Sequence, residues 1–178
     1  SEQTPLTALK LAAIFAEVLP EGVVNVVLGR GDTVGSALIN HPAVAMISIT
    51  GDIATGRKIM EAATKTIKRT HLELGGKAPV ILLEDADIDA AARAANFGSF
   101  MHQGQICMSV EKVLVHESIY SDFLRQFVAR AAKLKTGDTA DQANVIGPLI
   151  NDRQVERVKF QIEDALAKGA KAALGGRV

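Results

Sequence analysis

The hydrophobic positions of this 178-residue chain follow two alternating spacings. Short apolar or β-branched runs, typical of buried strands, occupy residues 23–28, 44–49, 67–74, 79–83 and 112–116. The segments between them carry apolar residues every three or four positions, which predicts helices over 4–19, 32–40, 51–63, 87–100, 118–134 and 152–167. Strands that alternate with helices in this way predict an α/β fold with mostly parallel strands.

Local signals define where several of these elements begin and end. We expect Thr4 to cap the first helix, with Pro5 in its first turn, and Asp87 to cap the Ala-rich helix. A loop is expected over 137–147. The pair Gly75-Gly76 interrupts a strand-like run, so we expect two domains, 1–74 and 75–178. A turn signal in 173–178 should lead into a further strand, and the chain starts at Ser1 without Met, so we expect a segment of a longer protein.

Composition argues against several classes of protein. Twenty Lys and Arg residues balance twenty Asp and Glu residues, so no overall field would attract nucleic acid or an anionic membrane surface. Hydrophobic residues make up 48% of the chain, enough for a core, but no stretch approaches the roughly 20 apolar residues of a membrane helix. One cysteine cannot form an internal disulfide and no signal-peptide pattern opens the chain, so we expect a reducing, cytoplasmic setting.

The single cysteine, Cys107, is the first candidate for chemistry. It follows the polar, flexible run Gln103-Gly104-Gln105, which is typical of a loop that exposes a thiolate beside backbone N–H donors. Upstream, Glu73 stands in a glycine-rich strand end, so the two residues suggest a nucleophile and its base. The alternative is that Cys107 is a buried apolar filler and Glu73 a solvated charge.

The histidines complete this inventory. His102 is a rival base, whereas His41, His71 and His116 have no partner in the sequence pattern. No Cys/His pair has metal-ligand spacing, so no metal site is expected.

Three glycine turns could hold the phosphates of a dinucleotide. In the first, Gly29, Gly31 and Gly35 follow a predicted strand and open a helix, although the third glycine comes one place late for G-x-G-x-x-G. The alternative for this turn is a tight connection whose glycines only relieve backbone strain. The second turn, 50–57, also lies at a strand end and a helix start, where an anion is favoured. Within it, Asp52 could instead cap the helix, and its charge would then oppose a pyrophosphate. The third turn, 75–77, is expected to leave space for the Glu73 side chain and to let the strand turn.

At this point the residues resemble a known family. Leu72-Glu73-Leu74-Gly75-Gly76-Lys77 and Gly104-Gln105-Ile106-Cys107 are similar to the glutamate and cysteine signatures of the NAD(P)-dependent aldehyde dehydrogenases, in the same order and near the usual spacing. The resemblance runs along the whole chain, through 1–7, 25–27, 50–57, 85–87 and 147–150. It implies an internal segment of a longer enzyme. Residues 1–74 would be the C-terminal part of a Rossmann-type coenzyme-binding domain and 75–178 the N-terminal part of an α/β catalytic domain.

The resemblance also implies a reaction. The Cys107 thiolate would attack an aldehyde to give a thiohemiacetal, hydride would pass to NAD, and a water activated by Glu73 would hydrolyse the thioester. Glu2 would bind the adenine ribose, and its carboxylate would repel a 2′-phosphate, which favours NAD over NADP. The residues implied in cofactor binding are Glu2, Gly29, Gly31, Gly35, Thr50, Gly51, Asp52, Gly56 and Leu74.

Several features refine this expectation. The family usually has Ser where this chain has Asp52, and an ionised carboxylate cannot donate a hydrogen bond to phosphate. The run 102–109 with Glu111 resembles the branch that acts on aromatic aldehydes such as benzaldehyde, salicylaldehyde or vanillin, and Met101, Ile106 and Met108 could offer an apolar wall to a ring.

The implied partners are a small-molecule aldehyde and further copies of the chain, as a dimer or tetramer. The alternative function is a non-catalytic nucleotide-binding or structural module whose thiol is inert.

Overall fold

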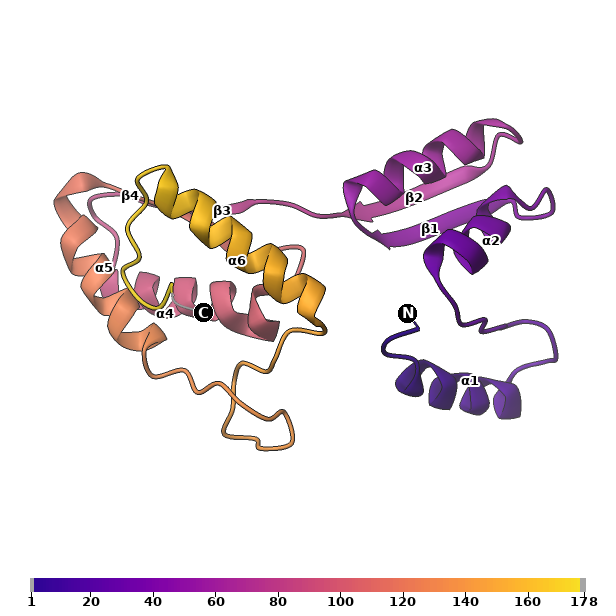
Figure 1. Cartoon of the computed structure of the whole chain (residues 1–178), viewed down its shortest axis with the longest axis horizontal. Helices are drawn as coiled ribbons and strands as arrows, with labels where there is room; N and C mark the ends of the chain where they lie inside the picture. The colour runs from indigo at the N-terminus through magenta and orange to yellow at the C-terminus, as the bar shows by residue number, and fades with distance from the viewer. Residues whose placement is uncertain (1, 177–178) are drawn as a thin grey trace. The chain divides into compact units, whose positions relative to one another are not determined.

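A computed structural model describes residues 2–176 of the chain. Ser1, Arg177 and Val178 lie outside the described residues, and with them the end of the run 173–178 that was expected to lead into a strand. The chain forms two compact units, one through Gly75 and one from Gly76 onward. Both units combine helices with parallel strands, which confirms the α/β class (Figure 1).

The first unit contains one parallel strand pair with a helix packed on it. Its elements are α1 (Leu6–Val18), the π-helical turn η1 (Gly31–Gly35), α2 (Ser36–Asn40), β1 (Met46–Gly51), α3 (Ile53–Thr64) and β2 (Arg69–Leu74). Met46 lies opposite Arg69 and Gly51 opposite Leu74 in the register of β1 and β2. Since α3 connects two parallel strands, the unit is a β-α-β arrangement. Ile59, Ala62 and Ala63 are the buried apolar side chains of α3.

Two strand expectations need correction in this unit. Residues 23–28 do not form a buried strand, because no strand pairs with them among residues 2–176 and the side chains of Val23 and Val27 are exposed. A β-branched run becomes a strand only where a neighbour satisfies its backbone groups. The strand expected over 67–74 is β2, which begins at Arg69. Ile67 lies in the turn after α3, with a left-handed φ of 51°.

The start of α1 also differs from expectation. Thr4 does not cap the helix, and Pro5 occupies the cap position without any side-chain cap bond. Hydrogen bonding begins at Pro5 because its backbone is already helical, with φ −87° and ψ −20°, and its carbonyl accepts from Leu9 N at 3.0 Å. The expected helix itself is present.

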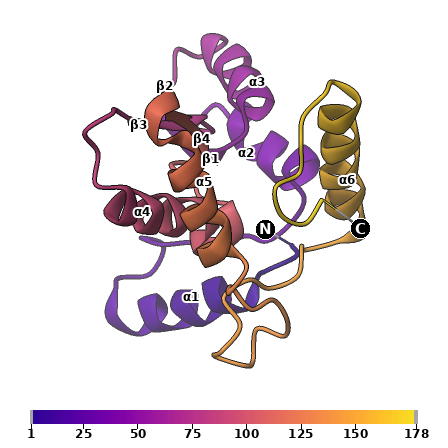
Figure 2. The same cartoon turned by 90° about the vertical axis from the view of Figure 1, so that its left-hand side faces the viewer.

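The second unit repeats the β-α-β arrangement. Its elements are β3 (Ala78–Leu82), α4 (Ile88–Phe100), the 3-10 turn η2 (Met101–Gly104), β4 (Val110–Val115), α5 (Glu117–Ala131) and α6 (Asp152–Ala167). Strands β3 and β4 are parallel, and α5 packs beside α4 (Figure 2). The core is formed by Leu82, Ala92, Ala95 and Phe123, and both alanines are 0% exposed. Small side chains on α4 therefore allow the close approach of its neighbours.

Local signals predicted this unit well. The Asp87 carboxylate caps α4 by accepting from Asp89 N and Ala90 N, both at 3.0 Å. The bounds of α6 are those expected from its periodicity. The loop over 137–147 is closed at its base, where Gly137 N donates to Ile146 O at 3.0 Å.

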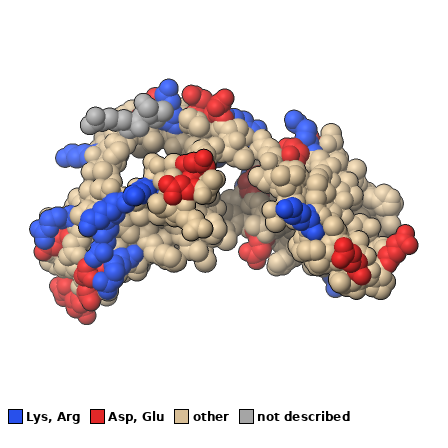
Figure 3. Space-filling view, turned by 90° about the horizontal axis from the view of Figure 1, so that it is seen from below, with Lys and Arg blue, Asp and Glu red and all other residues tan. Residues whose placement is uncertain are grey.

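The charged side chains are mixed in sign. On the face drawn in Figure 3, Lys and Arg lie among Asp and Glu on both units, in keeping with a net charge of zero. Among the described residues, no helix has both the length and the apolar character that a bilayer crossing requires.

Candidate active site

Cys107 lies at the tip of a tight turn between η2 and β4. Ser109 closes this turn twice, because its N–H donates to Ile106 O at 3.0 Å and its Oγ accepts from Ile106 N at 3.1 Å. Ser109 is only 3% exposed, whereas Cys107 is a free and exposed thiol. The cysteine is therefore not a buried apolar filler within this chain, and the loop that carries it has a defined shape.

The backbone before this turn is left-handed at three consecutive residues. His102 has φ 48° and ψ 38°, Gln103 has φ 63° and ψ 24°, and Gly104 has φ 70°. A left-handed backbone costs a non-glycine residue roughly 1–2 kcal/mol, so this run persists only because its surroundings hold it. Gln105 supplies part of that support, since its N–H donates to His102 O at 3.1 Å and its Nε2 to Gln103 Oε1 at 2.8 Å.

Gly76, the first residue of the second unit, lies close to the cysteine turn. A Cβ atom built on Gly76 would lie 3.3 Å from the carbonyl oxygen of Cys107, so the strand entry and the cysteine turn are in close contact there. Next to it, the Lys77 ammonium forms an ion pair with the Glu111 carboxylate at the start of β4. These two contacts fasten the beginning of β3 to the segment that carries the thiol.

Glu73 lies on β2 in the first unit, with its side chain 60% exposed. Its carboxylate Oε1 lies 3.6 Å from His71 Nε2, and His71 Nδ1 lies 3.1 Å from Ser48 Oγ. The sequence pattern shows no partner for His71, whereas in the structure the parallel register places Ser48 directly opposite it. That pairing is non-local and leaves no trace in the spacing of the sequence.

The other histidines also find local roles. His116 caps α5 by accepting from Ser118 N at 3.3 Å, and His41 Nδ1 accepts from Ala43 N at 3.2 Å. The rival base His102 is exposed in the left-handed run. Within residues 2–176, no group of three or more His, Cys, Asp or Glu side chains is arranged to hold a metal ion.

The first glycine turn combines tight packing with open space. A Cβ atom on Gly29 would lie 2.4 Å from Val34 Cγ2, so glycine is needed there for close approach. Around Gly31 and Gly35, by contrast, the position of a Cβ atom has no neighbour within 4 Å. A tight connection therefore accounts for Gly29, while the space beside Gly31 and Gly35 is open.

A paired arginine and aspartate stand in the same turn. Arg30 Nε donates to Asp32 Oδ1 at 3.0 Å and Nη2 to Oδ2 at 2.7 Å, which lowers the pKa of Asp32 below its ordinary value. The same hydrogen bond raises the pKa of Arg30, and the charge of Glu2 adds a smaller contribution in that direction.

The second glycine turn begins α3 and is capped by Asp52. The Asp52 carboxylate accepts from Thr55 N and from Thr55 Oγ1, both at 2.9 Å, and the bond from the Thr55 N–H is the main cause of its lowered pKa. Of the two interpretations of Asp52, the helix cap is the one observed. One turn on, Gly56 packs against Leu74, since a Cβ atom there would lie 3.0 Å from Leu74 Cδ1. Thr50 lies opposite Glu73 in the sheet, and Gly51 opposite Leu74.

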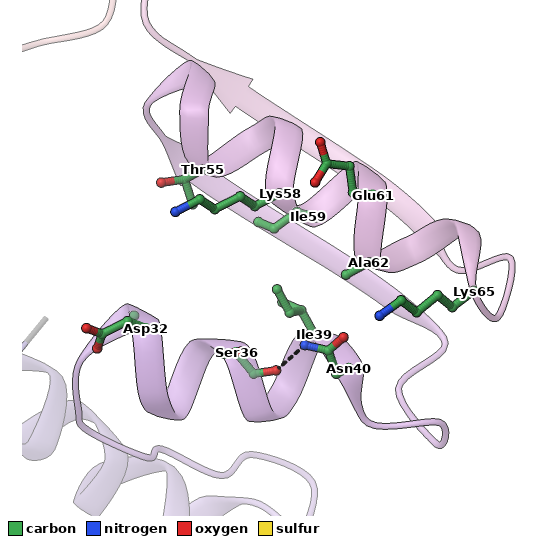
Figure 4. A pocket seen from close by; sticks show the side chains of 11 residues that line it. Asp32, Ser36, Ile39, Asn40, Thr55, Lys58, Ile59, Glu61, Ala62 and Lys65 are labelled. Atoms are coloured by element: carbon green, nitrogen blue, oxygen red, sulfur yellow. Dashed lines mark hydrogen bonds between the residues drawn. The ribbon is translucent and has the colours of Figure 1, made fainter.

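A cleft of about 600 Å³ separates α2 from α3 in the first unit (Figure 4). Gly31 is the one expected cofactor residue that lines it. The other lining residues are Asp32, Ser36, Ile39, Asn40, Thr55, Lys58, Ile59, Glu61, Ala62 and Lys65. Sequence reasoning missed most of them, although Thr55, Lys58, Ala62 and Lys65 recur every three or four positions on α3 and so mark one helix face.

Known proteins match this chain along its whole length. The family model described as the aldehyde dehydrogenase family matches residues 1–178. A betaine aldehyde dehydrogenase of Brucella anthropi is 44% identical over 179 residues, which is 100% of this chain and 37% of that protein. The chain therefore spans about 37% of the length of this curated relative.

Solved structures agree with this match. An NADP-dependent enzyme of Escherichia coli has a TM-score of 0.96 at 40% identity, over 100% of this chain and 37% of the other. The NAD+ complex of an aldehyde dehydrogenase from Bacillus cereus has a TM-score of 0.96 at 40% identity, over 99% and 36%. Because the family match covers every residue and the fold agrees with it, the chain belongs to the aldehyde dehydrogenase family.

Proposed function

We propose that this chain is an internal segment of a full-length protein that oxidises an aldehyde to its carboxylic acid with a nicotinamide cofactor. Residues 1–74 would belong to its coenzyme-binding domain and 75–178 to its catalytic domain. The observation that carries the proposal is the exposed thiol of Cys107 on a turn of fixed shape, closed by the buried Ser109. A nucleophile must be both accessible and held in place, and this turn meets both needs.

The reaction follows from the groups on the chain. The Cys107 thiolate attacks the aldehyde carbon, and the new oxyanion accepts a hydrogen bond from the Cys107 N–H. A bound nicotinamide supplies the hydride acceptor that turns the thiohemiacetal into a thioester. Glu73 then removes a proton from water, the hydroxide oxygen bonds to the acyl carbon, and the carbon–sulfur bond breaks to release the acid and the thiol.

The first unit offers groups that fit a dinucleotide. Gly31 opens onto the cleft between α2 and α3, where Lys58 and Lys65 could contact phosphate and the lining also carries Asp32 and Glu61. Glu2 interacts with the same glycine turn through Arg30. The Glu2 carboxylate would repel a 2′-phosphate, which supports NAD over NADP, whereas the charge of Asp32 is balanced by Arg30. Similar structures include NAD+ complexes and an NADP-dependent enzyme, so both cofactors are compared in the test.

The substrate proposal concerns the apolar side chains beside the thiol. Met101 and Met108 are exposed and Ile106 is half-buried, so they could contact an aromatic ring. The Brucella anthropi relative is named for betaine aldehyde, which has no ring. The activity assay therefore includes aliphatic as well as aromatic aldehydes.

The test measures NADH or NADPH formation by the full-length protein with aromatic and aliphatic aldehydes. We expect activity that Cys107→Ala abolishes, and a Glu73→Gln variant that still gives a first turnover but hydrolyses its thioester slowly. Equal loss in both steps would contradict the role of Glu73. Silence with every aldehyde and both cofactors would favour the alternative, a nucleotide-binding or structural module with an inert thiol. The expected dimer or tetramer can be checked on the same sample by light scattering.

A further inference from the structure

One face of the β1–β2 sheet carries only polar or charged side chains near its carboxyl end. Side chains alternate along each strand, so those on the same face as Leu74 pack toward α3, where Gly56 contacts Leu74. Ile47 is buried on that side. The opposite face presents Ser48, Thr50, His71 and Glu73, and the last two side chains are 58% and 60% exposed.

Three of these side chains form a connected row. Ser48 lies opposite His71 and Thr50 opposite Glu73 in the parallel register. Ser48 Oγ lies 3.1 Å from His71 Nδ1, and His71 Nε2 lies 3.6 Å from Glu73 Oε1. The imidazole therefore has one nitrogen held by a hydroxyl and the other aimed at the carboxylate. At 3.6 Å the second contact is longer than a hydrogen bond, and catalytic contacts commonly tighten in the substrate complex.

We infer that His71 is a positioning residue for Glu73, an inference that rests on the proposed function of Glu73 as the deacylation base. The Ser48 hydroxyl donates to Nδ1, which keeps the imidazole proton on Nε2. Nε2–H then donates to the Glu73 carboxylate and restricts its rotamers. The carboxylate of Glu73 is thereby held in an orientation from which it can accept a proton from water.

Other charged groups around this row are few. Arg69 lies on the same face of β2, two residues before His71, and β1 carries no ionisable side chain. The charged residues of α3, namely Arg57, Lys58 and Glu61, belong to the element that packs on the other face. Among the described residues of these elements, His71 is thus the ionisable group that contacts Glu73.

Two isosteric substitutions separate the two nitrogens of His71. In the full-length protein, His71→Gln places an amide N–H near the position of Nε2, whereas His71→Asn places one near Nδ1. We expect His71→Asn to slow thioester hydrolysis about five- to tenfold and to leave the first-turnover rate of NADH formation within about twofold. His71→Gln should retain at least about half of the hydrolysis rate.

The reference variant is Glu73→Gln. If Glu73→Gln leaves hydrolysis unchanged, the proposed function of Glu73 fails, and the role of His71 fails with it. If Glu73→Gln slows hydrolysis but His71→Asn matches the wild type, or slows acylation equally, only the positioning role is overturned. Adding His71→Asn to Glu73→Gln should have no further effect on hydrolysis. Thermal unfolding of each variant separates this kinetic result from a loss of fold.

Discussion

A Cβ atom built on Gly104 would lie 2.7 Å from the carbonyl oxygen of Ser99. Gly104 also has φ 70°, so an alanine there would meet both a backbone clash and a left-handed conformation that costs about 1–2 kcal/mol. We expect Gly104→Ala to lower the unfolding temperature of the full-length protein and the rate of its first turnover. Gly75→Ala is the control for stability, because no atom lies within 4 Å of its Cβ position and its φ is not positive. Equal shifts in the two variants would contradict this prediction.

Gly98 and Val110 form a second close approach, between α4 and β4. A Cβ atom on Gly98 would lie 2.6 Å from Val110 Cγ2, and valine has little rotamer freedom with which to avoid it. Gly98→Ala should therefore destabilise the protein by about 1–3 kcal/mol despite the better helix propensity of alanine. Chemical denaturation of Gly98→Ala, Val110→Ala and the double variant tests the contact. The double variant should be more stable than the sum of the single effects predicts, and strict additivity would show that the two sites do not interact.

The cap at Asp52 gives stability a dependence on pH. The bonds from Thr55 hold the pKa of Asp52 below its ordinary value of 3.8. A carboxylate with a depressed folded-state pKa stabilises the fold above its unfolded pKa, and that stability is lost as the pH falls through the folded-state pKa. Asp52→Asn keeps a capping side chain that does not titrate. As the pH falls below about 4, we expect the wild type to lose stability relative to Asp52→Asn. A constant difference between the two proteins over that range would contradict the assignment.

The same side chain should affect cofactor affinity. A negative charge at the N-terminus of α3 opposes an anion there, whereas serine caps the helix and can donate a hydrogen bond. Asp52→Ser should therefore lower the Kd for NAD about three- to tenfold, as measured by calorimetry on the full-length protein. An unchanged or weaker affinity would indicate that the pyrophosphate does not approach this helix end.

Cys107 should react as a single accessible thiol. Since it is the only cysteine in the chain and is exposed, one equivalent of iodoacetamide should label it without unfolding. In the full-length protein, a catalytic thiolate would alkylate faster than free cysteine near neutral pH, and NAD would change that rate. Mass spectrometry over time measures the alkylation of Cys107, and Cys107→Ala serves as the blank. A rate equal to that of free cysteine, unaffected by NAD, would favour the inert module.

Local chemistry explains which parts of the fold could be predicted. Asp87 and the periodicity of α6 specify their elements through neighbours a few residues away, and both were predicted correctly. Residues 23–28 have the composition of a strand, but a strand also needs a partner, which composition does not provide. Thr4 does not cap α1, because the adjacent Pro5 occupies the cap position.

The candidate site shows the same division. The exposure of Cys107 was foreseen from its polar neighbours, but the left-handed backbone at His102 and Gln103 was not, since neither residue type demands it. The contact between Ser48 and His71 depends on strand register, because the two residues are 23 positions apart in sequence. Contacts of that range follow from the assembled sheet and not from spacing along the chain.

The turn that carries Cys107 is closed by hydrogen bonds of Ile106 and Ser109, and the cysteine side chain takes no part in them. Removing the sulfur therefore leaves the shape of the loop intact. If the proposed function holds, Cys107→Ala in the full-length protein is a trapping variant: it should hold an unreacted aldehyde beside the bound nicotinamide cofactor, so that crystallography can capture the ternary complex.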